Sequence, residues 1–160
     1  MAGVAIYQTG IAPDWIDYNG HLRDAYYGLI VSYATDALME RIGMDASYRQ
    51  HSLCTLYTLE MHMHYLREVK GSDTVAVSVR IIAADHKRIH AAFELYAANQ
   101  AEPAATAEVM LLHVQQSVPV ASKPFPPALS DRIGELMRAS ASPLEAPALP
   151  GSRRMQLPQR

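Results

Sequence analysis

The chain has 160 residues, of which 49% are hydrophobic and 19% charged, a composition that suits a single domain with a substantial core. The formal net charge is −2 and no block of lysines and arginines occurs, so nothing indicates nucleic acid as a partner. One cysteine, Cys54, excludes an internal disulfide, and we find no signal peptide or membrane-spanning apolar run, so we expect a cytoplasmic protein with no membrane partner.

The first part of the chain predicts a strand, an ordered loop and a long helix. The strand covers 4–11, and the polar, aromatic, turn-rich stretch 14–21 predicts the loop. Apolar residues then recur at helical spacing over 24–42. Asp24 suits the N-cap of this helix, and Gly43 suits its C-terminal stop.

Four strands are expected next, because apolar and polar residues alternate between turn signals. Their predicted ranges are 53–69, 74–83, 88–97 and 104–117. In the first range the apolar residues alternate strictly with polar ones. The apolar set is Tyr57, Leu59, Met61, Met63 and Tyr65, and the polar set is Thr58, Glu60, His62 and His64.

The composition changes after residue 118, where prolines become frequent. A short amphipathic helix is predicted at 130–139. The remaining residues are rich in Pro, Ser, Ala and Arg and are expected to lack fixed structure. We therefore predict one domain over 1–139 and a flexible tail over 140–160.

The predicted order of elements gives an α+β architecture, with one long helix packed on a five-stranded antiparallel sheet. The apolar stripe of the helix is wider than one buried face needs. A sheet of this size also leaves open edges and apolar area exposed. Both features predict a homo-oligomer, either a dimer or a tetramer.

The loop before the long helix carries a specific motif. The sequence Trp-Ile-Asp-Tyr-Asn-Gly-His-Leu occupies 15–22 and is followed by Arg-Asp-Ala-Tyr-Tyr at 23–27. This segment resembles the hotdog-fold acyl-CoA thioesterases of the 4-hydroxybenzoyl-CoA thioesterase type. These enzymes carry an Asp, two variable residues and a Gly, often followed by His, where this chain has Asp17, Gly20 and His21. The Glu-Val end of the predicted strand 53–69 and the Gly-Ser-Asp turn after it are also similar, and the resemblance extends over roughly 4–125.

The resemblance implies a hotdog fold, in which the five-stranded antiparallel sheet wraps one long central helix. It implies hydrolysis of an acyl-CoA thioester, with no cofactor apart from the coenzyme A of the substrate. It also implies an active site at the interface of a homodimer or homotetramer. The phrase over 15–27 further resembles a branch linked to carnitine breakdown, whose members hydrolyse betainyl-CoA.

Thioester hydrolysis needs a carboxylate that attacks or activates water, and donors that stabilise the oxyanion. Asp17 precedes a helix N-terminus, where backbone N–H groups are free and the helix dipole is positive. The resemblance places the oxyanion donor at the backbone N–H near Asp24, with Gly20 permitting the tight loop. The alternative is that Asp17 is an ordinary loop carboxylate in an Asx turn and that Asp24 is only a helix cap.

The remaining substrate contacts predicted around this loop are Tyr18, Asn19, Tyr26 and Tyr27. Tyrosine faces attract a quaternary ammonium group by cation–π interaction, and Asp24 would add charge. The alternative is that Tyr26 and Tyr27 pack the helix. His21 either positions the substrate or ties the loop to the sheet.

The phosphates of coenzyme A require cations, and the resemblance indicates Lys87, Arg88 and Lys123, acting either within one subunit or across subunits. The alternative is that these side chains are simply solvated. Two histidines two residues apart, His62 and His64, suggest a metal site together with a nearby glutamate. A polar sheet face or a subunit contact explains them as well, and we expect no metal because the hydrolysis needs none.

Two other functions compete with hydrolysis. One is a non-catalytic module that binds acyl-CoA or an acyl carrier. The other is a hotdog acyl-CoA hydratase, although such enzymes carry an Asp/His pair on a longer overhanging segment that we do not find here.

Overall fold

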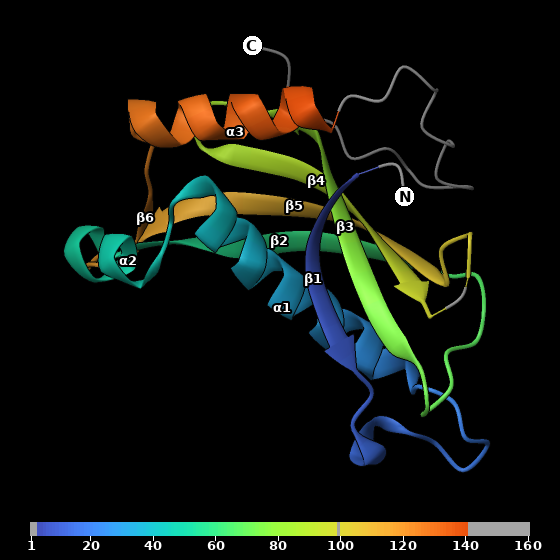
Figure 1. Ribbon diagram of the computed structural model, residues 1–160. Helices are drawn as coiled ribbons and strands as arrows, with labels where there is room; N and C mark the ends of the chain where they lie inside the picture. Colours follow the sequence, from blue (N-terminus) through green and yellow to red (C-terminus); the bar gives the residue numbers. More distant parts are fainter. Residues whose placement is uncertain (1–2, 99, 141–160) are drawn as a thin grey trace.

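Alternating apolar residues build an antiparallel sheet that curls around one long helix (Figure 1). The computed structural model describes residues 3–98 and 100–140. The strands are β1 (Val4–Gly10), β2 (Cys54–Tyr65), β3 (Thr74–Ala84), β4 (Arg88–Ala97), β5 (Ala105–Gln115) and β6 (Ala121–Ser122). The helices are α1 (Asp24–Ile42), α2 (Ala46–Ser52) and α3 (Pro127–Ala139), with a 3-10 turn at Pro13–Trp15.

The sheet has the order β1-β3-β4-β5-β2, and the short β6 pairs with β5. All these pairings are antiparallel. The predicted α+β class is confirmed, and the five long strands lie where the alternation indicated. The predicted number of strands, five, is wrong, because the sheet also contains β6. This strand has two residues and is too short to show any alternation.

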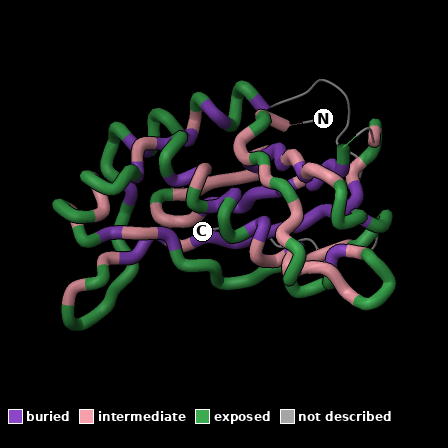
Figure 2. Tube along the Cα trace, turned by 60° about the horizontal axis from the view of Figure 1, so that its bottom comes forward, coloured by how far each residue is buried: buried purple, intermediate pink, exposed green. Residues whose placement is uncertain are grey.

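The core lies between α1 and the sheet face that it covers. Helix α1 contributes buried residues at helical spacing, namely Tyr27, Ile30, Val31, Ala34, Leu38 and Ile42. The sheet contributes Val75, Val77, Val79, Ile89, Phe93, Leu95, Val109 and Leu111. Buried positions run along the middle of the sheet, and its connecting loops are exposed (Figure 2).

Both ends of α1 are informative. Gly43 ends the helix in the left-handed conformation with φ 92°, which confirms the prediction. The predicted N-cap is wrong by one position, because Arg23 caps the helix and Asp24 is its first residue. The backbone N–H of Arg23 donates to the Trp15 carbonyl at 3.0 Å and its Nε donates to the Ile16 carbonyl at 3.1 Å, which holds Arg23 extended.

Helix α2 was not predicted from the sequence, because seven residues are too few to show helical periodicity. The Asp45 side chain caps it by accepting from the Tyr48 N–H at 2.8 Å. Helix α3 begins at Pro127, three residues before the predicted start, since proline is tolerated in a first helical turn. Ser140 is buried and caps α3, whereas the rest of the predicted tail, 141–160, lies outside the described residues.

Strand β2 departs from its predicted alternation. A register shift lies between Thr58 and Glu60, so that Tyr57 stands opposite Leu112 while Met61 stands opposite the core residue Val109. Directly opposed residues share a face, and a bulge exchanges the two faces. The prediction of one apolar face from Tyr57 to Tyr65 is therefore wrong, since Tyr57 lies on the opposite face from Met61, Met63 and Tyr65.

Strand β2 is also an edge of the sheet and ends at Tyr65, before the predicted end at 69. Leu59 and Tyr65 are each 55% exposed, so this edge presents apolar side chains to the surroundings of a single chain. No helix in the described part of the chain is long and apolar enough to cross a membrane.

Candidate active site

The loop before α1 forms a tight turn around Asp17. The Asp17 N–H donates to the His21 carbonyl at 2.9 Å, and the Gly20 N–H donates to the Asp17 carbonyl at 3.1 Å. Gly20 has φ 83°, in the left-handed region that glycine adopts without a steric penalty. The predicted need for glycine in this turn therefore has a conformational basis.

The same loop is held against the segment that follows β2. The Leu22 N–H donates to the Val69 carbonyl at 2.8 Å, and the Gly71 N–H donates to the Gly20 carbonyl at 3.3 Å. The imidazole Nε2 of His21 lies 3.1 Å from Glu68 Oε2. Main-chain and side-chain contacts together fix where the loop presents Asp17.

The Asp17 carboxylate uses its two oxygens differently. Its Oδ1 accepts from the backbone N–H of Asn19 at 2.8 Å and from that of His21 at 3.0 Å. Among the described residues, Oδ2 accepts only from the Asn19 side-chain amide, at 3.5 Å. The hydrogen bond from the His21 N–H lowers the pKa of Asp17, against a smaller opposing effect of desolvation. An Asx turn is thus present, and the ionised carboxylate still keeps one oxygen for chemistry.

The N-terminus of α1 supplies a candidate oxyanion donor. The Ala25 N–H donates to Asp24 Oδ1 at 2.8 Å, and the Tyr26 N–H donates to the Arg23 carbonyl at 3.1 Å. Within residues 3–98 and 100–140, no acceptor pairs with the backbone N–H of Asp24. This N–H sits at the positive end of the helix dipole.

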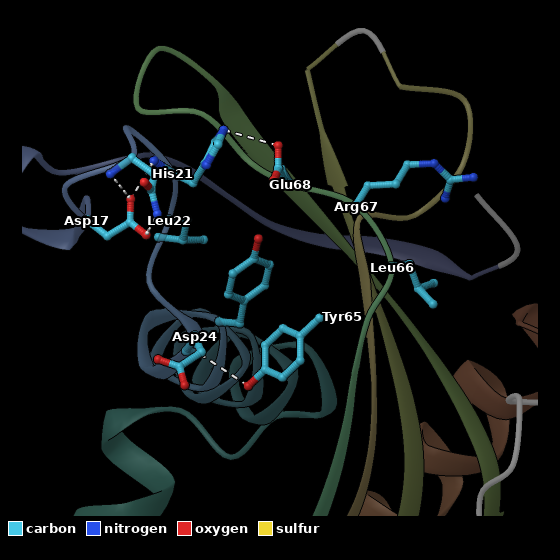
Figure 3. Close-up of a pocket in the computed structure, with 10 residues that line it drawn as sticks. Asp17, His21, Leu22, Asp24, Tyr65, Leu66, Arg67 and Glu68 are labelled. Carbon is cyan, nitrogen blue, oxygen red and sulfur yellow. Dashed lines mark hydrogen bonds and ion pairs between the residues drawn. The ribbon is translucent and has the colours of Figure 1, made fainter.

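A hollow of about 400 Å³ brings these groups together (Figure 3). One side is formed by the loop and the start of α1, and the other by the end of β2 and the segment after it. The lining residues are Asp17, Asn19, His21, Leu22, Asp24, Tyr27, Tyr65, Leu66, Arg67 and Glu68. Asp17 and Asp24 therefore face one shared space, as a carboxylate and an oxyanion donor must.

The predicted aromatic contacts divide into two groups. Tyr27 lines the hollow, and its ring meets the ring of Tyr65 edge-on, with 5.2 Å between centroids and an angle of 88°. Tyr26 instead stacks on Trp15, with 5.4 Å between centroids and 16° between planes. Tyr18 is 94% exposed and is absent from the lining.

The hollow is acidic. Its described lining carries three carboxylates, Asp17, Asp24 and Glu68, against one guanidinium, that of Arg67. The guanidinium is already paired with Glu102 and donates to the Pro103 carbonyl at 2.9 Å. A cleft lined by one sign of charge concentrates ligands of the other sign, so this one favours a cationic group.

Comparison with known proteins identifies the family. Residues 11–133 match the model of the thioesterase-like superfamily. The chain belongs to this superfamily. It is 44% identical over 133 residues, 83% of each chain, to the betainyl-CoA thioesterase of Pseudomonas aeruginosa.

Two solved structures extend the comparison. A candidate thioesterase from Pseudomonas putida KT2440 has 42% identity, a TM-score of 0.80 and 99% coverage of both chains. A hypothetical protein from Staphylococcus aureus, solved in complex with CoA, has 27% identity and a TM-score of 0.84 and covers 99% of this chain and 98% of its own. The predicted membership of the hotdog-fold acyl-CoA thioesterases is thus confirmed, and the chain is a thioester hydrolase.

Sequence reasoning missed one wall of the candidate site. Tyr65, Leu66, Arg67 and Glu68 were assigned to a strand, and Leu22 was not singled out. The available signal was the pair of charges, Arg67 and Glu68, at the end of an apolar strand. The N–H groups of Leu66 and Arg67 both donate to the Ala104 carbonyl, at 2.8 and 2.9 Å, which ends the β2 ladder and frees this segment.

Within one chain, the cations predicted to bind CoA lie away from the hollow, and a contact across subunits stays a prediction. Lys87 precedes β4, and Arg88 is its first residue. The opposite end of β4 is the one near the pre-helix loop, because it pairs with the start of β3. A ten-residue strand spans about 30 Å, so these side chains do not meet Asp17 within one chain. Arg88 is held by Asp85 through two hydrogen bonds of 2.9 and 2.6 Å. Lys123 Nζ donates to Gln115 at 3.2 Å.

The described residues around the histidine pair of β2 are not arranged as a metal site. His62 Nε2 lies 2.6 Å from Glu60 Oε1 on the sheet face away from α1. Among the residues that the structure describes, no group of three His, Cys, Asp or Glu side chains is arranged to hold a metal ion.

Proposed function

We propose that this chain hydrolyses betainyl-CoA to betaine and free coenzyme A, with Asp17 as the reactive carboxylate. The observation that carries the proposal is the acidic hollow shared by Asp17, Asp24 and Glu68. The 44% identical relative from Pseudomonas aeruginosa bears the name of this activity. The phrase over 15–27, which resembles the carnitine-breakdown branch, points to the same substrate, and we expect the enzyme in the cytoplasm.

Recognition of the acyl group follows from charge and aromatic surface. The betainyl group carries a trimethylammonium cation, which cannot accept or donate conventional hydrogen bonds. It is recognised instead by π faces and carboxylates. Tyr27 and Tyr65 supply the faces, and Asp24 and Glu68, which line the same hollow, supply negative charge. The cation-binding set is therefore proposed as Tyr27, Tyr65, Asp24 and Glu68, in place of Tyr18 and Tyr26.

Asp17 can act by two routes. As a nucleophile, its free oxygen attacks the thioester carbonyl, the C–S bond breaks, coenzyme A leaves as a thiolate, and water hydrolyses the resulting anhydride. As a general base, it takes a proton from water, and the water oxygen attacks the carbonyl; the C–S bond then breaks, and coenzyme A leaves as a thiol with the proton that Asp17 gives back. In either route the Asp24 backbone N–H stabilises the oxyanion.

The active unit is proposed to be a homodimer or a tetramer built from dimers. The exposed apolar edge of β2 suits pairing with β2 of a second copy, and open edges of this kind are normally covered. Because Tyr65 belongs to β2 and lines the hollow, such an interface would run beside the active site.

The test compares two acyl-CoA substrates of nearly equal shape. Betainyl-CoA and 3,3-dimethylbutanoyl-CoA differ mainly in a quaternary nitrogen replacing a quaternary carbon, so only the first is cationic. We expect free CoA release from betainyl-CoA to have at least tenfold higher kcat/KM, and Tyr65→Leu to reduce this ratio by about fivefold. Tyr33→Leu on the exposed side of α1 is the control and should leave the ratio unchanged. Equal turnover of both substrates would contradict the cationic specificity.

The same assay separates the competing functions. Tight binding of acyl-CoA without CoA release would favour the binding module. Addition of water to an enoyl-CoA without CoA release would favour the hydratase. A single turnover in ¹⁸O-labelled water tests the nucleophilic route, because label in the Asp17 carboxylate arises only when water attacks the aspartyl carbonyl of the anhydride.

A further inference from the structure

We infer that Arg67 binds the phosphates of coenzyme A, and that Glu102 is the counter-ion which Arg67 releases when the nucleotide arrives. The inference rests on the proposed action on a CoA thioester. It assigns the nucleotide end of the substrate to a pair of residues that sequence reasoning did not single out.

The position of Arg67 suits a rim contact. It lies on the segment after β2, across the hollow from Asp17 (Figure 3). Its side chain is 41% exposed and that of Glu102 is 69% exposed. An exposed ion pair is worth little net free energy, because water solvates the separated partners well. The guanidinium can therefore exchange Glu102 for another anion at low cost.

The acidity of the hollow creates the need for such a cation. Three carboxylates attract the cationic acyl group but repel the several negative charges at the other end of the substrate. Arginine presents a planar fork of donors that matches two phosphate oxygens at once. A guanidinium at the rim, once released from Glu102, would therefore offer the phosphates a positive charge beside the acidic hollow.

Within one chain, the other predicted cations lie away from the hollow. Lys87, Arg88 and Lys123 lie at the far end of the sheet, and Arg88 is committed to Asp85 through two hydrogen bonds. Of the described residues that line the hollow, Arg67 is the one lysine or arginine.

Substitutions of Arg67 and of Glu102 should change CoA binding in opposite directions. Removing the charge of Arg67 should weaken CoA binding, whereas removing the charge of Glu102 should strengthen it, because the phosphate no longer competes with a carboxylate. Pantetheine, which carries the same thiol arm without phosphates, should be indifferent to both changes.

Calorimetric titration of free CoA and of pantetheine tests this. For Arg67→Gln we expect about tenfold weaker CoA binding and unchanged pantetheine binding. Arg67→Lys, which keeps the charge but not the fork, should recover part of the loss, and Glu102→Gln should tighten CoA binding several-fold. Arg49→Gln is the matched control. Like Arg67, Arg49 donates to a glutamate (Glu40) and to a backbone carbonyl (Met44), but it does not line the hollow.

The outcomes are decisive and independent of catalysis. Unchanged CoA affinity in Arg67→Gln would overturn the inference, and so would an equal loss for CoA and pantetheine, which would indicate a damaged pocket. Weaker CoA binding in Glu102→Gln would also contradict it. The titrations follow binding alone, so failure to hydrolyse betainyl-CoA would reject the proposed function without altering this result.

Discussion

The imidazole Nε2 of His21 lies 3.1 Å from the Oε2 atom of Glu68, and the backbone N–H of the same histidine donates to Asp17 Oδ1 at 3.0 Å. One residue therefore connects the segment after β2 to the carboxylate proposed to react. Glu68 reaches Asp17 only through His21, which makes it a positioning residue for the reaction.

Replacing Glu68 with glutamine should lower kcat roughly tenfold for the neutral isostere, because a small displacement of a reacting group is costly. Hydrolysis of betainyl-CoA should fall further, because Glu68 also supplies charge to the proposed cation-binding set. If Glu68 acts through charge alone, only betainyl-CoA would be affected. The pair is exposed, so stability should change by less than about 0.5 kcal/mol. Glu60→Gln is the control, since Glu60 forms a similar pair with His62 away from the hollow.

Alanine at Gly20 and at Gly28 should have opposite effects on stability. Gly20 has φ 83°, and a Cβ there would meet no atom within 4 Å, so the cost is conformational and amounts to roughly 1–2 kcal/mol. Gly28 lies inside α1 with open space around it, and alanine there should stabilise by about 0.5–1 kcal/mol. Denaturant unfolding measures both. Only Gly20→Ala should also lower kcat, and a stabilised Gly20→Ala would contradict the proposed strain.

Acid should destabilise the fold through His113. Its Nδ1 lies 2.7 Å from the Lys123 carbonyl, which can only accept, so Nε2 is left to accept from the Tyr48 hydroxyl at 3.0 Å. Burial lowers the pKa of His113 below its usual value of 6.5. The unfolded chain then binds a proton before the folded chain does, so stability falls as the pH drops below about 6.5.

The measurement is the free energy of unfolding between about pH 8 and about pH 5 for the wild type and for His113→Asn, which keeps a donor for the Lys123 carbonyl. The variant should be less stable at neutral pH but lose less stability on acidification. Parallel pH dependence in both proteins would show that His113 does not contribute.

Lysine at Met61 should weaken self-association. Met61 lies on the α1 side of the β2 edge and is 39% exposed in the single chain, so the change should cost little in the isolated fold. Sedimentation velocity should show a shift towards monomer and a parallel loss of hydrolysis. Ala5→Lys, on the opposite edge strand β1, is the control. An unchanged assembly would place the interface elsewhere.

Periodicity sufficed for the elements that are long. The stripe through Tyr27, Ile30 and Leu38 located α1 to its end residues, and alternation located β3 and β4 to within a residue. The motif around Asp17 could be found because its contacts are local, between residues two to four positions apart.

The rest depended on contacts that one sequence does not display. The far wall of the hollow meets the loop across long separations, as where the Tyr65 hydroxyl lies 3.4 Å from the Asp24 carbonyl. The bulge after Thr58 exchanged the faces of β2 without any glycine or proline to indicate it. The short helix α2 begins at a single capping residue, Asp45. In the sequence an aspartate at this position looks the same as a turn residue, so the helix could not be recognised.

The central claim is tested most directly by free-CoA release from betainyl-CoA by the wild type and by Asp17→Asn, with Asp14→Asn as the control on the exposed turn before the loop. Asparagine keeps the Oδ1 acceptor for the Asn19 and His21 N–H groups, so the loop should stay folded. We predict that kcat falls at least a hundredfold in Asp17→Asn, as expected for loss of the reactive group, and is unchanged in Asp14→Asn. Hydrolysis at the wild-type rate by Asp17→Asn would contradict the account.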